Sequence, residues 1–396
     1  MVKNPKALVA LLALCQAFFN SSSSIMALTT GLVGFQFLGE DTTLATVPVS
    51  AMVIGTAIAT APASMIMRRV GRRAGFSIGA LVGILGALVA CFAMWHLSFW
   101  GFSFGILLLG MYNGFANYYR FAAADVASDS FRSRAISLVL VGGVVAAFLG
   151  PEIALRTADL IPEVRFLGTY LAVIVLVAIS LGLIQLISIP KPTLNERSDS
   201  GRPMSEIMRQ PKFIVAVMSS MIGFATMVLI MTATPIAMVE QFHHALTEAK
   251  TVIQWHVVAM FAPSLITGTL IARYGATSII ATGIVFMAGS IAFAVTGVAF
   301  LNFWAALFLL GLGWNFMFVG GSSLLTETYA PAERAKAQGF HDFMVFGLVA
   351  IASLSSGALL QLLSWRAVSL GAVPFLALVT LALIWLFLRR PEPVEA

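Results

Sequence analysis

The sequence predicts an all-α membrane protein whose twelve transmembrane helices form two pseudo-symmetric six-helix bundles. Composition is the first reason: of the 396 residues, 59% are hydrophobic and 10% are charged, whereas soluble domains are about half apolar and about a quarter charged. The second is that apolar runs of about 20 residues recur along the chain, which is the length an α-helix needs to cross a bilayer. Alternation of polar and apolar residues, the sign of a membrane β-barrel, is absent from these runs.

Basic residues are distributed unevenly around the predicted spans. An even number of spans puts both termini on one side of the membrane, and that side carries 18 of the 23 basic residues. The positive-inside rule therefore predicts that both termini are cytoplasmic. Because this charge lies in short connections, we read it as a topology signal and expect no nucleic-acid partner. The predicted spans are about 6–30, 43–67, 75–95, 99–122, 135–156, 166–189, 212–238, 250–272, 277–299, 302–325, 338–362 and 368–388.

A polar segment rich in Ser, Pro and alternating charge divides the chain near its middle. We predict an N-terminal six-helix bundle over 1–190, a cytoplasmic linker over 191–211 and a C-terminal six-helix bundle over 212–396. Internal similarity supports this division, because Ser64–Arg73 recurs as Gly268–Gly275 at an offset of 204 residues. Charged residues between 125 and 135 recur between 327 and 337 at an offset of 202.

The basic turn Arg68-Arg69-Val70-Gly71-Arg72-Arg73 between two spans, and the parallel six-span halves, resemble the major facilitator superfamily. The resemblance implies a secondary transporter that works by alternating access, and we expect a monomer in the lipid bilayer. The superfamily has an acidic residue where this chain has Arg68, so that residue's gating role is not carried over. A phosphate-binding loop or a nucleophile with a neighbouring base is not recognisable, and we expect neither an enzyme nor a bound cofactor.

Two pairs of soft ligands lie on consecutive spans, each pair four residues apart: Met227 with Met231, and His256 with Met260. Residues four apart share one face of a helix. At about 1.5 Å per residue, the four side chains lie at matching depths below the turn that joins the two spans. Thioether and imidazole groups suit Cu(I), and His256 is an ionisable residue within an apolar segment. The pattern predicts a transient copper site.

Within the superfamily, MxxxM followed by HxxxM resembles the CcoA-type bacterial copper importers, and the stretches Thr232–Met238 and Ile253–Ser264 extend the likeness. The resemblance implies import of a copper ion or small copper chelate across the bacterial inner membrane, for assembly of cytochrome c oxidase. Copper is then the transported substrate. The same family is also similar to bacterial riboflavin transporters, so import of riboflavin or another small planar organic molecule is the alternative.

Polar and aromatic residues within the spans favour this alternative. Spans one, four, seven and ten of this fold typically line a central cavity, and a cavity of amide and aromatic groups suits a flat organic ring better than a bare ion. The predicted recognition residues are Asn20, Asn113, Asn117, Tyr118 and Trp314.

Ionisable residues near the cytoplasmic ends of the spans carry two further predictions. Arg120, Asp125 and Glu327 are interpreted as a charge cluster that clamps the halves together. His341 and Asp342 lie in span eleven, but the matching positions of the first half are apolar. This pair is therefore a candidate proton-coupling element, and an exposed pair at the membrane interface is the equally weighted alternative.

Overall fold

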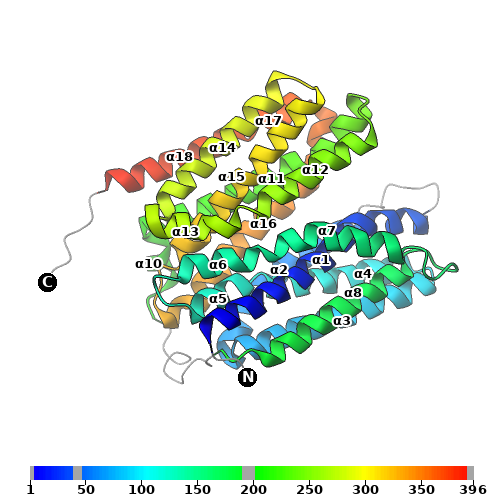
Figure 1. The fold of residues 1–396 in the computed structure, drawn as a ribbon, viewed down its shortest axis with the longest axis horizontal. Coiled ribbons are helices and arrows are strands. Elements are labelled where there is room, and N and C mark those ends of the chain that lie inside the picture. Colours follow the sequence, from blue (N-terminus) through cyan, green and yellow to red (C-terminus); the bar gives the residue numbers. More distant parts are fainter. Residues whose placement is uncertain (1–3, 39–46, 190–200, 390–396) are drawn as a thin grey trace.

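The structure is a computed structural model that describes residues 4–38, 47–189 and 201–389, and helices dominate these ranges (Figure 1). Within these ranges, twelve helical segments are long and apolar enough to cross a membrane. The predicted fold class and the number of spans are thus confirmed. Helices are the expected solution, because a lipid-exposed backbone must satisfy its own polar groups.

The first bundle contains the helices that precede the linker. Its helices are α1 (Pro5–Leu38), α2 (Val47–Val70), α3 (Arg72–Trp95), α4 (Phe99–Ala116), α5 (Tyr119–Val126), α6 (Arg132–Leu140), α7 (Gly142–Thr157) and α8 (Leu167–Leu186). The second bundle follows a short amphipathic turn, α10 (Met204–Arg209). Its helices are α11 (Pro211–Ile236), α12 (Leu246–Phe261), α13 (Ser264–Tyr274), α14 (Ala276–Thr296), α15 (Phe300–Leu325), α16 (Arg334–Leu362), α17 (Trp365–Leu370) and α18 (Val373–Leu388), with a π-helical turn at Ala237–Gln241 and a 3-10 turn at Pro331–Glu333.

Several spans are interrupted. The fourth span consists of α4 and α5 and breaks at Asn117 and Tyr118, the fifth breaks at Val141 between α6 and α7, and the eighth breaks at Pro263 between α12 and α13. A proline accounts for the break in the eighth span, because it cannot donate a backbone hydrogen bond. The break in the fourth span places polar residues beside the interior of the protein, where irregular backbone is tolerated.

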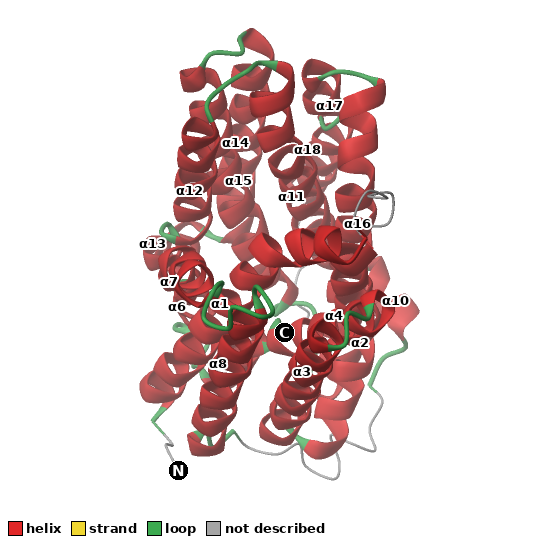
Figure 2. Ribbon diagram, turned by 90° about the vertical axis from the view of Figure 1, so that its right-hand side faces the viewer, coloured by secondary structure: helices red, strands yellow, loops and turns green. Residues whose placement is uncertain are grey.

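The two bundles meet at the end of the molecule where α1 begins and α18 ends, and they diverge toward the opposite end (Figure 1). Figure 2 shows the molecule from that opposite end, with the second bundle above the first. We call the end where the bundles meet the closed end. There α2 packs against α16, and α6 packs against α13. The Ser64 hydroxyl donates to the carbonyl oxygen of Ala335 at 2.6 Å, and the Ser137 hydroxyl donates to that of Ser264. These contacts join residues of the two bundles directly.

The predicted linker is described only at its end, because residues 191–200 lie outside the described ranges. Arg202 contacts the buried carboxylate of Glu333, to which its backbone N–H and its Nε donate at 2.8 Å and its Nη2 at 2.7 Å. The end of the linker is therefore held against the start of α16. The exact boundaries of the three predicted regions stay a prediction.

Small residues allow the helices of the first bundle to approach closely. A Cβ atom added to Gly110 on α4 would lie 2.1 Å from the carbonyl oxygen of Met52 on α2, and one added to Gly55 on α2 would lie 2.2 Å from that of Leu107. Both overlaps are with backbone, so rotation of a side chain cannot relieve them. Glycine at such crossings is typical of helix packing in membranes.

Gly110→Ala is expected to destabilise the protein by about 1 to 3 kcal/mol, because the two helices must separate to admit the methyl group. The matched control is Gly182→Ala on α8, where an added Cβ meets no atom within 4 Å. There the higher helix propensity of alanine predicts a gain of up to about 1 kcal/mol. Unfolding of the purified variants in detergent measures both changes, and equal stability of the two would contradict the packing described here.

Candidate functional site

A cavity of about 260 Å³ lies between the two bundles. Helices of the first bundle that line it are α1, α2, α4, α5 and α6, and those of the second are α11, α12, α15 and α16. Its volume is close to the lower end of the range of about 300 to 1,000 Å³ that is usual for small-molecule sites. A site shared by both bundles is where a binding event can affect how the bundles are arranged.

The first bundle gives the cavity an amide face, which consists of Gln16, Asn20, Asn113 and Asn117, with Ser23 beside them. The Gln16 side chain donates to Asn20 Oδ1 at 3.1 Å, and the Ser23 hydroxyl donates to Asn113 Oδ1 at 3.4 Å. These bonds fix how the amides are presented. Polar groups that would be costly against lipid thus face an enclosed space.

The second bundle gives the cavity an aromatic face centred on Trp314 of α15. The Trp314 ring stacks on Phe318 at 5.1 Å with an interplanar angle of 14°, and it meets Phe224 and Phe261 edge-on at 5.3 and 5.5 Å. Phe346 from α16 packs against Phe224 at 5.7 Å. Each aromatic contact holds its neighbours in position. The cavity therefore has one hydrogen-bonding wall and one aromatic wall.

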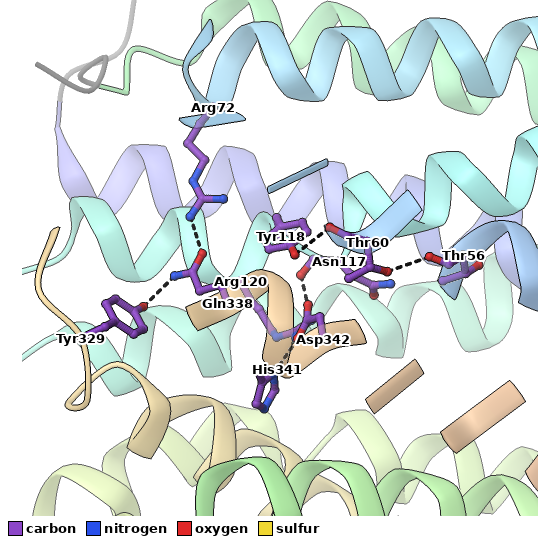
Figure 3. Close-up of polar contacts among 10 residues, drawn as sticks. All are labelled: Thr56, Thr60, Arg72, Asn117, Tyr118, Arg120, Tyr329, Gln338, His341 and Asp342. Carbon is purple, nitrogen blue, oxygen red and sulfur yellow. Dashed lines mark hydrogen bonds and ion pairs between the residues drawn. The ribbon is translucent and has the colours of Figure 1, made fainter. Parts of the chain in front are cut away.

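Arg120 of α5 lines the cavity and joins the two bundles through a buried ion pair. Its Nη2 donates to Asp342 Oδ1 of α16 at 2.5 Å, and its Nη1 donates to the carbonyl oxygen of Asn117 at 2.8 Å (Figure 3). His341 Nδ1 lies 2.7 Å from the same Asp342 oxygen. Because a carboxylate oxygen only accepts, His341 carries a hydrogen on Nδ1. We call Arg120, His341 and Asp342 the buried triad.

A second charged layer lies at the closed end. Arg72 contacts Asp125 at 2.9 Å. It also donates to Gln338 Oε1 at 2.6 Å, and Gln338 Nε2 donates to the Tyr329 hydroxyl at 2.6 Å (Figure 3). Arg334 of the second bundle also contacts Asp125, at 3.1 Å. Through the contacts of Arg72 with Gln338 and of Arg334 with Asp125, this layer links the two bundles beyond the buried triad.

The predicted recognition residues lie in two places. Asn20, Asn113, Asn117 and Trp314 line the cavity. Tyr118 does not; its hydroxyl donates to the carbonyl oxygen of Thr60 at 2.9 Å, so its polar group fixes the break between α4 and α5 against α2. His341 and Asp342 are buried, so the alternative prediction of a pair exposed at the membrane interface is wrong.

The four predicted copper ligands do not converge on the cavity. Of the four, only Met260 is among the residues that line it. His256 is fully buried, and its Nδ1 lies 2.7 Å from the carbonyl oxygen of Leu307 on α15. Helix α12 packs mainly against α15 and only slightly against α11, which carries Met227 and Met231. The prediction compared depth along two helices but could not say which faces look toward each other. Among the described residues, no group of three or more His, Cys, Asp or Glu side chains could hold a metal ion.

Arg120 does join the two halves, as the predicted charge cluster requires, but its position and its partner differ from the prediction. It is buried and pairs with Asp342 of the second bundle, whereas Glu327 contacts Lys212 at 2.8 Å within its own bundle. Asp125 does join the two bundles, through Arg334. The usable signal was an arginine well inside a span, because such residues rarely lack a partner in the interior.

Comparison with known proteins places the chain in context. The family model described as Major Facilitator Superfamily matches residues 9–242 and residues 215–396. The chain is 42% identical over 390 residues, 98% of each chain, to the riboflavin transporter RfnT of Brucella anthropi, and 27% identical, over 92% of this chain and 87% of the other, to the uncharacterised transporter YddS of Bacillus subtilis. The structure also superposes on the crystal structure of the E. coli fucose:proton symporter FucP with a TM-score of 0.75, over 95% of this chain and 98% of that one. The sequence identity is 17%, so this similarity concerns the fold alone.

The prediction of copper import is wrong. A relative that is 42% identical over 98% of this chain is a riboflavin transporter, and riboflavin was the alternative substrate. The geometry agrees with this correction, because His256 faces α15 and the methionines of α11 lie away from the cavity wall. The thioether pattern is better explained as packing in an apolar interior, where methionine commonly fills gaps.

Proposed function

Because the chain belongs to the Major Facilitator Superfamily, we propose that it is a secondary transporter that imports riboflavin, or another small molecule with a similar planar ring, by alternating access. The observation that carries the proposal is the cavity with one amide wall and one aromatic wall. A flavin ring has apolar faces and a polar edge, so it can stack on Trp314 while its edge meets the amides. The similarity to a riboflavin transporter supports the same substrate class.

The orientation in the membrane is inferred from the distribution of charge. Basic residues concentrate at the closed end, so we place that end and both termini in the cytoplasm of a bacterium, with the protein in the inner membrane. The bundles then diverge toward the outside, and the cavity receives its substrate from there. The protein works as a monomer in the lipid bilayer, without a cofactor.

Energy for accumulation is assigned to the buried triad. An uncharged flavin gains nothing from the membrane potential, which acts on charge at about 2.3 kcal/mol per 100 mV. Uptake against a gradient therefore needs a coupled ion. A proton bound by Asp342 would remove the charge that holds Arg120 and so weaken a bond between the bundles. His341, on the same oxygen, is the neighbour through which that proton can pass.

Expression of this protein is expected to restore growth of a riboflavin auxotroph at a low external riboflavin concentration. Asn113→Leu should lower uptake about tenfold, because loss of amide hydrogen bonds costs about 1 to 1.5 kcal/mol. The matched control is Asn302→Leu at the outer end of α15, whose amide contacts Thr296 at 3.4 Å and does not line the cavity. Failure of the wild type to restore growth, with normal amounts of protein in the membrane, would refute the proposed substrate.

A further inference from the structure

Three buried N–H groups around the cavity have no hydrogen-bond acceptor within the described parts of the chain. They are Asn20 Nδ2, Arg120 Nε and Trp314 Nε1, and each belongs to a residue that lines the cavity. No buried acceptor atom of the described lining residues is left unpaired in the same way. Unpaired buried donors are uncommon and costly in folded proteins. Three of them around one cavity therefore need an explanation.

Each of these donors is held in place by contacts made through other atoms. Asn20 uses its oxygen to accept from Gln16, which leaves its NH₂ group available. The Arg120 guanidinium lies between the rings of Phe121 and Phe318, at 4.4 and 4.7 Å from their centroids, and its two terminal nitrogens are already bonded. Nε is the one nitrogen of this guanidinium without a partner among the described residues. Such fixed donors are preorganised for a ligand that brings acceptors.

Trp314 has an internal comparison in the same bundle. The indole N–H of Trp365, which is also buried, donates to the carbonyl oxygen of Ala294 at 3.0 Å. The Trp314 ring is fixed by its aromatic neighbours, and its N–H donates to no protein atom among the described residues. A buried tryptophan N–H usually finds a partner. The Trp314 side chain lines the cavity, but its N–H is itself covered, so an acceptor on a bound ligand would supply the missing partner after a small shift of a neighbouring side chain.

We propose that the cavity selects substrates by their hydrogen-bond acceptors, which Asn20, Arg120 and Trp314 bind as a set of donors that we call the donor triad. The ligand class is a neutral or anionic planar heteroaromatic molecule with carbonyl oxygens or unprotonated ring nitrogens along one edge. A cationic ring is excluded, because it would meet the Arg120 guanidinium. Arg120 thereby becomes a specificity-determining residue as well as a partner of Asp342.

This inference rests on the proposed function and makes it more specific. The isoalloxazine ring of riboflavin carries two carbonyl oxygens and two unprotonated ring nitrogens, but only one ring N–H. Its edge is therefore rich in acceptors, as the donor triad requires. A substrate bound at Nε and Asp342 bound at Nη2 would share one guanidinium, so recognition and the bond between the bundles are linked through one side chain.

Uptake of riboflavin, 1-deazariboflavin and 5-deazariboflavin tests the proposal, because each analogue replaces one ring nitrogen acceptor by C–H and keeps the shape. In the wild type, at least one analogue is expected to be taken up about fivefold less efficiently than riboflavin. Trp314→Phe, which removes the N–H and keeps an aromatic ring, should raise the KM for riboflavin by a similar factor.

Asn20→Leu and Arg120→Lys complete the series of variants. A variant that takes up riboflavin and one deaza analogue equally well identifies the donor that faces the replaced nitrogen.

The matched control is Trp304→Phe on the same helix, which lies outside the cavity and should leave uptake unchanged. A shift in the unfolding temperature of the purified protein, with the same three ligands, reports binding without transport. Equal uptake and equal binding of all three compounds, with an unchanged KM in Trp314→Phe, would overturn the donor triad but leave riboflavin transport intact. If riboflavin neither binds nor is transported, the proposed function and this inference both fall.

Discussion

Arg120→Ala is expected to lower the free energy of unfolding by about 3 to 5 kcal/mol and to abolish uptake. The substitution leaves the Asp342 carboxylate buried without its cation, and removal of one partner of a buried ion pair is far more costly than loss of an exposed pair. The two side chains are 2% and 0% exposed. The same change removes a cavity donor, so stability and substrate recognition should fall together.

The control for this loss is Arg156→Ala. Arg156 pairs with Glu152 at 2.5 Å, but the side chains are 78% and 54% exposed, so this bond contributes at most about 0.5 kcal/mol. Chemical unfolding of the purified variants separates the two cases. Similar stability of Arg120→Ala and Arg156→Ala would contradict the assignment of a buried ion pair between the bundles.

Asp342→Asn is expected to remove the pH dependence of uptake. Among the described residues, Arg120 and His341 pair with Asp342, and Tyr118 lies close enough to interact with it electrostatically. If Asp342 takes a proton from outside, wild-type uptake rises as the external pH falls, and an uncoupler prevents accumulation. Asparagine has a similar shape but cannot be titrated, so the variant should only equilibrate its substrate across the membrane.

Asp129→Asn is the matched control, because the Asp129 carboxylate is 90% exposed and contacts Arg132 at the surface. It should retain the wild-type response to pH and to the uncoupler. Initial rates of riboflavin uptake over a series of external pH values measure the difference. If Asp342→Asn kept both responses, the proton would have to bind elsewhere.

The sequence was sufficient to predict the spans because length and hydropathy decide whether a segment crosses a bilayer. Interruptions were harder to predict. Pro263 marks the break in the eighth span, but Asn117 and Val141 carry no comparable signal. Those breaks depend on neighbouring helices that supply or replace hydrogen bonds, and such partners are distant in sequence. Contacts such as that of Gly110 with Met52 depend on the same distant partners.

The site, too, could be predicted only in part, because it depends on residues that are distant in sequence. Polar residues within spans were correctly suspected of facing the interior, and Asn20, Asn113 and Trp314 do line the cavity. Periodicity could not establish the direction in which each helix faces, so His256 was placed opposite α11 although it contacts Leu307 on α15. The pairing of Arg120 with Asp342 spans 222 positions in the chain and is visible only in three dimensions.

Radiolabelled riboflavin uptake into liposomes that contain the purified protein tests the central claim most directly. The account predicts saturable uptake that unlabelled riboflavin competes away, that Asn113→Leu reduces and that Asn302→Leu retains. Uptake no greater than in protein-free liposomes, measured with folded protein under an imposed proton gradient, would contradict the claim.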